Sequence, residues 1–150
     1  MKLVSESLNE LYNFEKKDNP LDSLGIGKKA LIEKWLNEMG VKDYTINNDF
    51  TINVDGDVDL KNKHLIKFPD YIQFNVVHGC FTCSTNQLIS LKGCSRIVDE
   101  SFWCFQNKLT SLKYCPEIVN GNFCCYKNKK QFTKEEVRKY CDVKNVNIYV

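Results

Sequence analysis

The stretch GCFTCSTNQLISLKGCSRIVD, residues 79–99, is followed at once by a second version of itself, ESFWCFQNKLTSLKYCPEIVN, at 100–120. The unit at 121–141 keeps the same register through its first half. Three positions hold one residue type in all three units: Phe81, Phe102 and Phe123; Cys83, Cys104 and Cys125; Asn86, Asn107 and Asn128. The first two units also share Leu88 with Leu109, Leu91 with Leu112, Cys94 with Cys115, Ile97 with Ile118 and Val98 with Val119. A fixed period of 21 residues indicates coils that stack and bury their apolar faces on one another.

Within a unit, the pattern predicts a short strand followed by a turn. Phe81 and Cys83 are two residues apart, so a strand places both side chains on one face, toward the core. Asn86 follows where the chain leaves the strand, and its amide can bond backbone groups. Equivalent asparagines in successive coils would then form a ladder. The repeat therefore predicts a solenoid built on stacked phenylalanine, cysteine and asparagine positions.

Weaker units flank these three. Residues 56–78 form a degenerate unit, and the residues at 145–150 alternate as one more strand. In the unit at 56–78, the inward apolar positions are Val58, Leu60, Leu65 and Phe68. In the strand at 145–150, they are Val146 and Ile148. We therefore predict about four coils between residues 56 and 150.

Other patterns predict caps for the two ends of the stack, which a solenoid needs. Apolar spacing predicts helices at 3–15 and 28–39, and the alternating stretch YTINNDFTINVDG predicts a hairpin that turns at residues 47–49. At the other end, Thr133 and Glu136 form a capping box that predicts a short helix ending near Tyr140.

With these residues aligned, the chain resembles the leucine-rich-repeat-like proteins that tailed bacteriophages and prophages encode. The likeness rests on NQLISLKGC, NKLTSLKYCPEIVNGNF, the leader GIGKKALIEKWLNEMGVKDYTINNDFTINVDGDVDL and the tail FTKEEVRKYCDV, and it covers most of residues 24–150. It implies architecture and a viral origin, and it supplies no catalytic residues. The predicted fold class is α+β: a short leucine-rich-repeat-like β-solenoid in 56–150 with a C-terminal capping helix, preceded by a helix and hairpin cap in 1–55.

All eight cysteines lie after residue 79. The pair Cys80 and Cys83 has the spacing of a metal or redox motif, but the repeat distributes equivalent cysteines one to a coil instead of around one point. Free cysteine is among the most buried residue types, so we predict core thiols, no metal and no cofactor. The chain shows neither a signal-peptide core nor a membrane-spanning apolar run, which predicts the cytoplasm, that of the host cell if the protein is viral.

The sequence does not predict an enzyme. Neither histidine, His64 or His78, has an evident carboxylate or nucleophile partner, and no phosphate-binding loop, serine elbow or HExxH motif occurs. Cys80, Cys124 and Cys141 are candidate nucleophiles, but nothing local would lower their pKa.

Strand alternation predicts instead a binding surface on the outer side of the sheet. Successive coils should display there the pairs Asp57/Asp59, Thr82/Ser84, Trp103/Phe105, Cys124/Tyr126 and Asn147/Tyr149. Exposed together, Trp103, Phe105, Tyr126 and Tyr149 would be typical of a protein-binding hot spot. Lys108 and Lys127 would add a basic rim. Two alternatives stay open: the C-terminal helix covers the aromatic residues, or the lysines are a solvated edge.

We therefore predict a non-enzymatic module that binds a host or phage protein, in host takeover or in inhibition of a bacterial defence system. One alternative is a nucleotide-sequestering protein, in which the aromatic residues stack a base. A second is nucleic-acid binding through Gly25, Gly27, Lys28 and Lys29, which resemble the hairpin of helix-hairpin-helix modules. Residues 1–55 carry 7 basic against 10 acidic side chains, which disfavours this second alternative.

Overall fold

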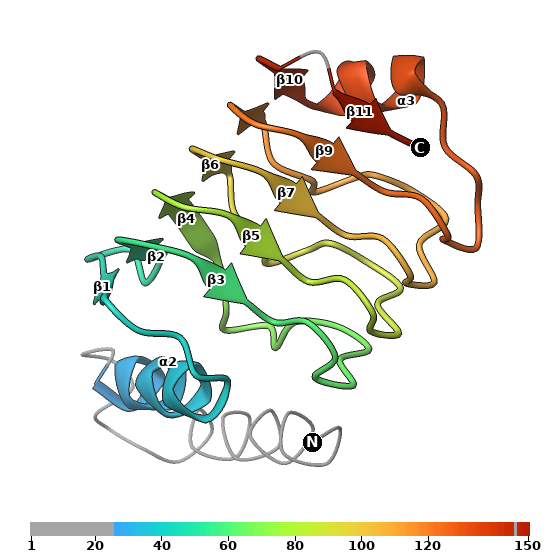
Figure 1. Ribbon diagram of the computed structural model, residues 1–150. Coiled ribbons are helices and arrows are strands. Elements are labelled where there is room, and N and C mark those ends of the chain that lie inside the picture. The colour runs from blue at the N-terminus through green and yellow to red at the C-terminus, as the bar shows by residue number, and fades with distance from the viewer. Residues whose placement is uncertain (1–25, 146) are drawn as a thin grey trace.

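The 21-residue period folds as a β-solenoid, and the described residues place helix α2 before the stack and helix α3 near its C-terminal end (Figure 1). The computed structural model describes residues 26–145 and 147–150. In chain order the elements are α2 (Ile26–Glu38), β1 (Tyr44–Ile46), β2 (Ile52–Val54), β3 (Val58–Asp59), β4 (Phe74–Val77), β5 (Phe81–Thr82), β6 (Ile97–Val98), β7 (Phe102–Trp103), β8 (Ile118–Val119), β9 (Phe123–Cys124), α3 (Lys134–Tyr140), β10 (Asp142–Val143) and β11 (Ile148–Tyr149).

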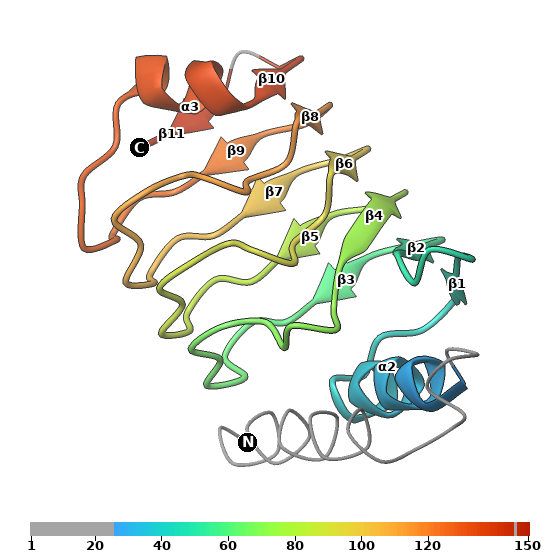
Figure 2. The same cartoon turned by 180° about the vertical axis from the view of Figure 1, so that it is seen from behind.

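Each coil contributes one short strand to each of two sheets. The six-stranded sheet has the order β1-β2-β4-β6-β8-β10, and the five-stranded sheet has the order β11-β9-β7-β5-β3. All pairings are parallel except the β1–β2 hairpin. After a strand of the five-stranded sheet, a long loop leads the chain to the six-stranded sheet of the next coil, as both views show (Figures 1 and 2).

The strand register matches the repeat. Phe81 pairs with Phe102, and Phe102 with Phe123. The ladder continues to Val58 on one side and to Ile148 on the other. All five side chains are buried. The five-stranded sheet thus has five coils, one more than the four predicted, because the residues around β11 complete a coil of their own.

A continuous column of rings fills the core. Phe81 and Phe102 have ring centroids 5.8 Å apart, and Phe102 and Phe123 are 5.2 Å apart. At the N-terminal end, Trp35 of α2 packs edge-on against Phe74 at 6.4 Å. Edge-to-face and tilted ring pairs at these distances are favourable, so the column joins the helical cap to the coils.

The predicted asparagine ladder is confirmed. The Asn107 side-chain oxygen accepts a hydrogen bond from the Leu88 backbone N–H at 3.0 Å. Its amide nitrogen donates to the carbonyl oxygens of Cys83 and Cys104, at 3.0 and 3.1 Å. Asn86 and Asn128 make the equivalent bonds one coil before and one coil after. Each asparagine therefore ties its own coil to the preceding one.

Most of the predicted cap elements are present, with shifted bounds. Helix α2 begins at Ile26, two residues earlier than predicted, and the hairpin turns across residues 47–51, where the Asn47 N–H bonds the Thr51 carbonyl at 2.8 Å. Helix α3 begins as its capping box predicts: the Thr133 hydroxyl accepts from the Glu136 N–H at 3.2 Å. The predicted helix at 3–15 and the predicted inward position of Val146 lie outside the described residues.

Candidate functional site

The outer side of the five-stranded sheet carries the predicted aromatic residues. Thr82 pairs with Trp103, Trp103 with Cys124, and Cys124 with Tyr149, so these four side chains form one row across four coils. Trp103 is 39% exposed and Tyr149 is 49% exposed. Both rank among the most exposed large hydrophobic residues of the described chain.

A second row runs beside the first. Phe105 and Tyr126 stack with ring centroids 4.7 Å apart and planes only 6° from parallel, and both are half-buried. Parallel stacking orders the two rings before any partner arrives, so little side-chain entropy remains to be lost on binding. We call the surface formed by Trp103, Phe105, Tyr126 and Tyr149 the aromatic face.

The C-terminal helix leaves the aromatic face open. Helix α3 lies at the end of the stack beyond β9, where it contacts β10 and β11, and its Val137 is buried (Figure 1). The sequence left open whether the C-terminal helix covers the aromatic residues, and the exposure of Trp103 and Tyr149 shows that it does not cover these two.

Two of the residues expected on this side are not exposed. Ser84 is fully buried, and its hydroxyl lies 2.9 Å from that of Thr82. Cys124 is only 9% exposed although it lies outside the core cluster. Both are short side chains, and Cys124 pairs in the ladder with the large Trp103. The prediction that these two positions are displayed was wrong.

The predicted basic rim is exposed beside the aromatic face. Lys108 and Lys127 both reach solvent, whereas the nearby Lys130 forms an ion pair with Glu136 at 2.6 Å. A hollow of about 320 Å³ lies next to Tyr126 and is lined by Lys127, Asn128, Gln131 and Val150. Its volume is at the lower end for small-molecule sites.

The described residues proposed as phosphate contacts lie in the first turn of helix α2. Helix α2 already includes Gly27 and Lys28, so Gly27 is not in a loop before the helix. The Lys28 ammonium lies 4.8 Å from the centre of the Phe50 ring, and Lys29 is exposed. Gly25 lies outside the described residues. Gly27 lies in the first turn of α2, where backbone N–H groups have no partner within the helix, so the phosphate contact proposed there stays a prediction.

The cysteines divide by position. Burial raises the pKa of the Cys83, Cys94 and Cys104 thiols, which all lie in the core. Burial also raises the pKa of Cys124 to about 11 and that of Cys141 to about 12. These thiols stay protonated at neutral pH and are poor nucleophiles. The CxxC motif is split, because Cys83 points into the core and Cys80 is partly exposed.

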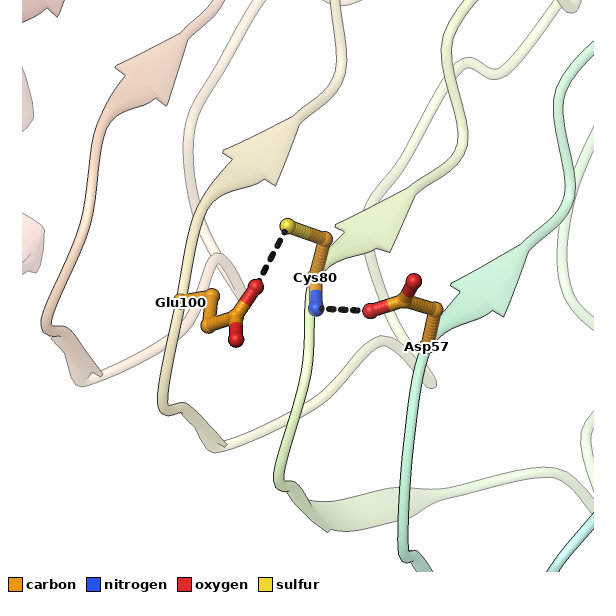
Figure 3. A group of neighbouring side chains, drawn as sticks. All are labelled: Asp57, Cys80 and Glu100. Carbon is orange, nitrogen blue, oxygen red and sulfur yellow. Dashed lines mark hydrogen bonds between the residues drawn. The ribbon is translucent and has the colours of Figure 1, made fainter.

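A polar corner that the sequence did not predict lies where the chain passes from the six-stranded to the five-stranded sheet. The His78 ring nitrogen Nδ1 lies 2.7 Å from the Asp99 carboxylate, so the expectation that His78 lacks a carboxylate partner was wrong. Nearby, Asp57, Cys80 and Glu100 converge from three coils (Figure 3). The repeat register held the signal for His78, since residue 99 is 21 positions after residue 78.

Comparisons with protein-family models, with curated proteins and with solved structures each found no match for this chain. Over the described residues, neither helix has the length and apolar character needed to cross a membrane.

Proposed function

We propose that this protein is a non-enzymatic binding module that engages another protein through the aromatic face. The observation that carries the proposal is the exposure of Trp103 and Tyr149 in one ladder row, next to the stacked pair Phe105 and Tyr126. Tryptophan and tyrosine dominate the energetically important positions of protein interfaces. Their exposure in water costs free energy that a partner would recover by covering them.

The sheet holds these side chains in a defined arrangement. The backbone of the Trp103 strand is hydrogen-bonded on both sides: the Cys83 N–H donates to the Trp103 carbonyl, and the Cys104 N–H donates to the Cys124 carbonyl. A surface ordered in this way favours binding without a large conformational change.

The charge beside the aromatic face indicates what kind of partner surface would fit it. Lys108 and Lys127 are exposed at the turns that follow the strands of the aromatic face. We expect a partner surface with an apolar pocket for Trp103 or Tyr149 and with acidic side chains that face these two lysines.

The test is a comparative capture experiment. The wild-type chain, a Trp103→Ala/Tyr149→Ala variant and a Tyr114→Ala control are immobilised and exposed to lysate of the producing or infected cell. Tyr114 is 49% exposed like Tyr149, but it lies outside the aromatic face. A protein retained by wild type and control and lost by the double variant supports the proposal. Retention of the same proteins by all three chains contradicts it.

The biological setting rests on the resemblance to phage-encoded repeat proteins. We propose a viral origin and a role in host takeover or in inhibition of a bacterial defence system, in the host cytoplasm. All eight cysteines are free thiols, which agrees with a reducing compartment.

A further inference from the structure

Three side chains of two ligand classes meet at the corner between the two sheets. Asp57, Cys80 and Glu100 come from three successive coils, and their ligand atoms all lie within 4.8 Å of one another. Figure 3 shows the Cys80 thiol directed toward the Glu100 carboxylate, with Asp57 on the other side of Cys80. The Sγ–Oε2 distance is 3.3 Å. In a tetrahedral site with bonds of about 2.0–2.3 Å, ligand atoms lie roughly 3.5 Å apart, so little movement is needed.

Glu100 stands where three of the other coils have glycine. Gly56, Gly79 and Gly121 occupy the same corner position, before Asp57, Cys80 and Asn122 respectively. Glu100 is thus the one of these four corner residues that has a side chain. Its carboxylate accepts a hydrogen bond from the Cys80 thiol of the preceding coil. Glycine is required at position 79, because a Cβ atom there would lie 2.7 Å from the backbone carbonyl carbon of Gly56.

The ligand atoms remain available in this arrangement. Asp57 Oδ1 accepts the Cys80 backbone N–H at 2.8 Å, which orients the carboxylate beside the thiol and leaves Oδ2 for a ligand. Asp57 and Glu100 are exposed and Cys80 is partly exposed, so an ion can reach the group from solvent.

We propose that Asp57, Cys80 and Glu100 bind one thiophilic divalent cation of the zinc class at this corner. Zinc accepts one thiolate and two carboxylate oxygens, and a water molecule completes four-coordination. On binding, the thiol proton passes to solvent and the thiolate takes its place on the metal. This site is distinct from the six core cysteines that the repeat stacks inside the solenoid. It ties three coils together at the margin of the aromatic face.

Cobalt(II) is the probe, because a cobalt–thiolate bond gives a charge-transfer absorption that carboxylates alone do not. The reduced full-length protein is titrated with Co²⁺, and Zn²⁺ is then added to displace it. The variants are Cys80→Ser, Asp57→Asn and Glu100→Gln. Two controls match them: Cys124→Ser removes another thiol on the outer side of the sheet, and Asp59→Asn removes an exposed carboxylate two residues from Asp57.

Wild type and both controls should show the thiolate band, saturating at one equivalent of Co²⁺ and displaced by Zn²⁺. Cys80→Ser should abolish the band, and each carboxylate variant should weaken binding at least about tenfold. Metal-free melting curves of wild type and the three site variants should coincide, because the three side chains lie at or near the surface. The proposal is overturned if wild type shows no band, or if the band survives in Cys80→Ser.

Discussion

The two sides of the five-stranded sheet follow opposite rules, although their residues alternate along the same strands. The inward row reads Val58, Phe81, Phe102, Phe123 and Ile148, and each member is buried. The outward row reads Asp59, Thr82, Trp103, Cys124 and Tyr149, with a different side chain in every coil. Both rows belong to the same five strands and the same ladder, so the difference between them lies in which face of the sheet their side chains occupy.

This comparison separates packing from recognition. An inward position must fill the same space in each coil, which is why its residues recur with the period of the stack. An outward position has no such constraint, so its residues are available for contacts with other molecules. The aromatic face and the corner of Asp57, Cys80 and Glu100 both occur where coils differ from one another.

The largest expected effect is on the inward row. Phe102→Ala removes a fully buried ring that packs against Phe81 and Phe123, and it should lower the free energy of unfolding by about 3–5 kcal/mol through the cavity it leaves. Urea denaturation followed by circular dichroism measures the change. A loss below about 1 kcal/mol would show that the inward column does not carry the stability of the coils.

The asparagine ladder should come next. Asn107→Ala leaves the Leu88 N–H and the Cys83 carbonyl without their side-chain partner inside the stack, so we expect a loss of about 2–4 kcal/mol. The exposed Asn120, in the same coil, is the matched control, and Asn120→Ala should change stability by less than about 0.5 kcal/mol. Equal melting temperatures for the two variants would contradict a structural role for the ladder.

The aromatic face should be sensitive in binding instead of stability. Against a partner isolated by the capture experiment, Trp103→Ala and Tyr126→Ala should each weaken binding by about 1–2 kcal/mol or more. Isothermal titration calorimetry measures the affinity, with Tyr114→Ala as the control. Unchanged affinity in both variants would place the interface elsewhere on the molecule.

The smallest effect on stability is expected at the turn that follows β7, where the alternation of inward and outward side chains stops. Gln106 has a φ of 52°, a left-handed conformation that is strained for residues other than glycine. Gln106→Gly should raise stability by up to about 1 kcal/mol, whereas Lys108→Gly, at an exposed position without positive φ, should lower it by about 0.5–1 kcal/mol. Thermal melts show whether each variant is more or less stable than the wild type. An equal loss of stability in both variants would contradict backbone strain at Gln106.

Much of the fold was predictable because the period appears directly in the sequence. Phe81, Phe102 and Phe123 fixed the register of the five-stranded sheet, and the asparagines marked where each strand ends. The strands of the six-stranded sheet were harder to predict, since two-residue strands such as Ile97–Val98 are too short for an alternating pattern. The strand at 145–150 was predicted, with Ile148 inward, but it was not counted as a full coil because the chain departs from the repeat after Phe132, where α3 is inserted.

The candidate sites were predictable to different degrees. Alternation alone placed Trp103 and Tyr149 on the outer surface, but it gave no measure of how far a short side chain such as Ser84 is buried there. The corner depends on contacts between coils. Cys80 and Glu100 are 20 residues apart, and their approach follows from the direction of the Glu100 side chain. Sequence spacing does not specify that direction.

The most direct test of the central claim compares two adjacent residues, Phe102 and Trp103, in one experiment. Urea unfolding of Phe102→Ala, Trp103→Ala and the wild type gives the three free energies of unfolding under the same conditions. We predict that Trp103→Ala loses less than about 1 kcal/mol, against about 3–5 kcal/mol for Phe102→Ala. If Trp103→Ala destabilises the protein as much as Phe102→Ala, the outward row contributes to packing, and the aromatic face is not a free binding surface.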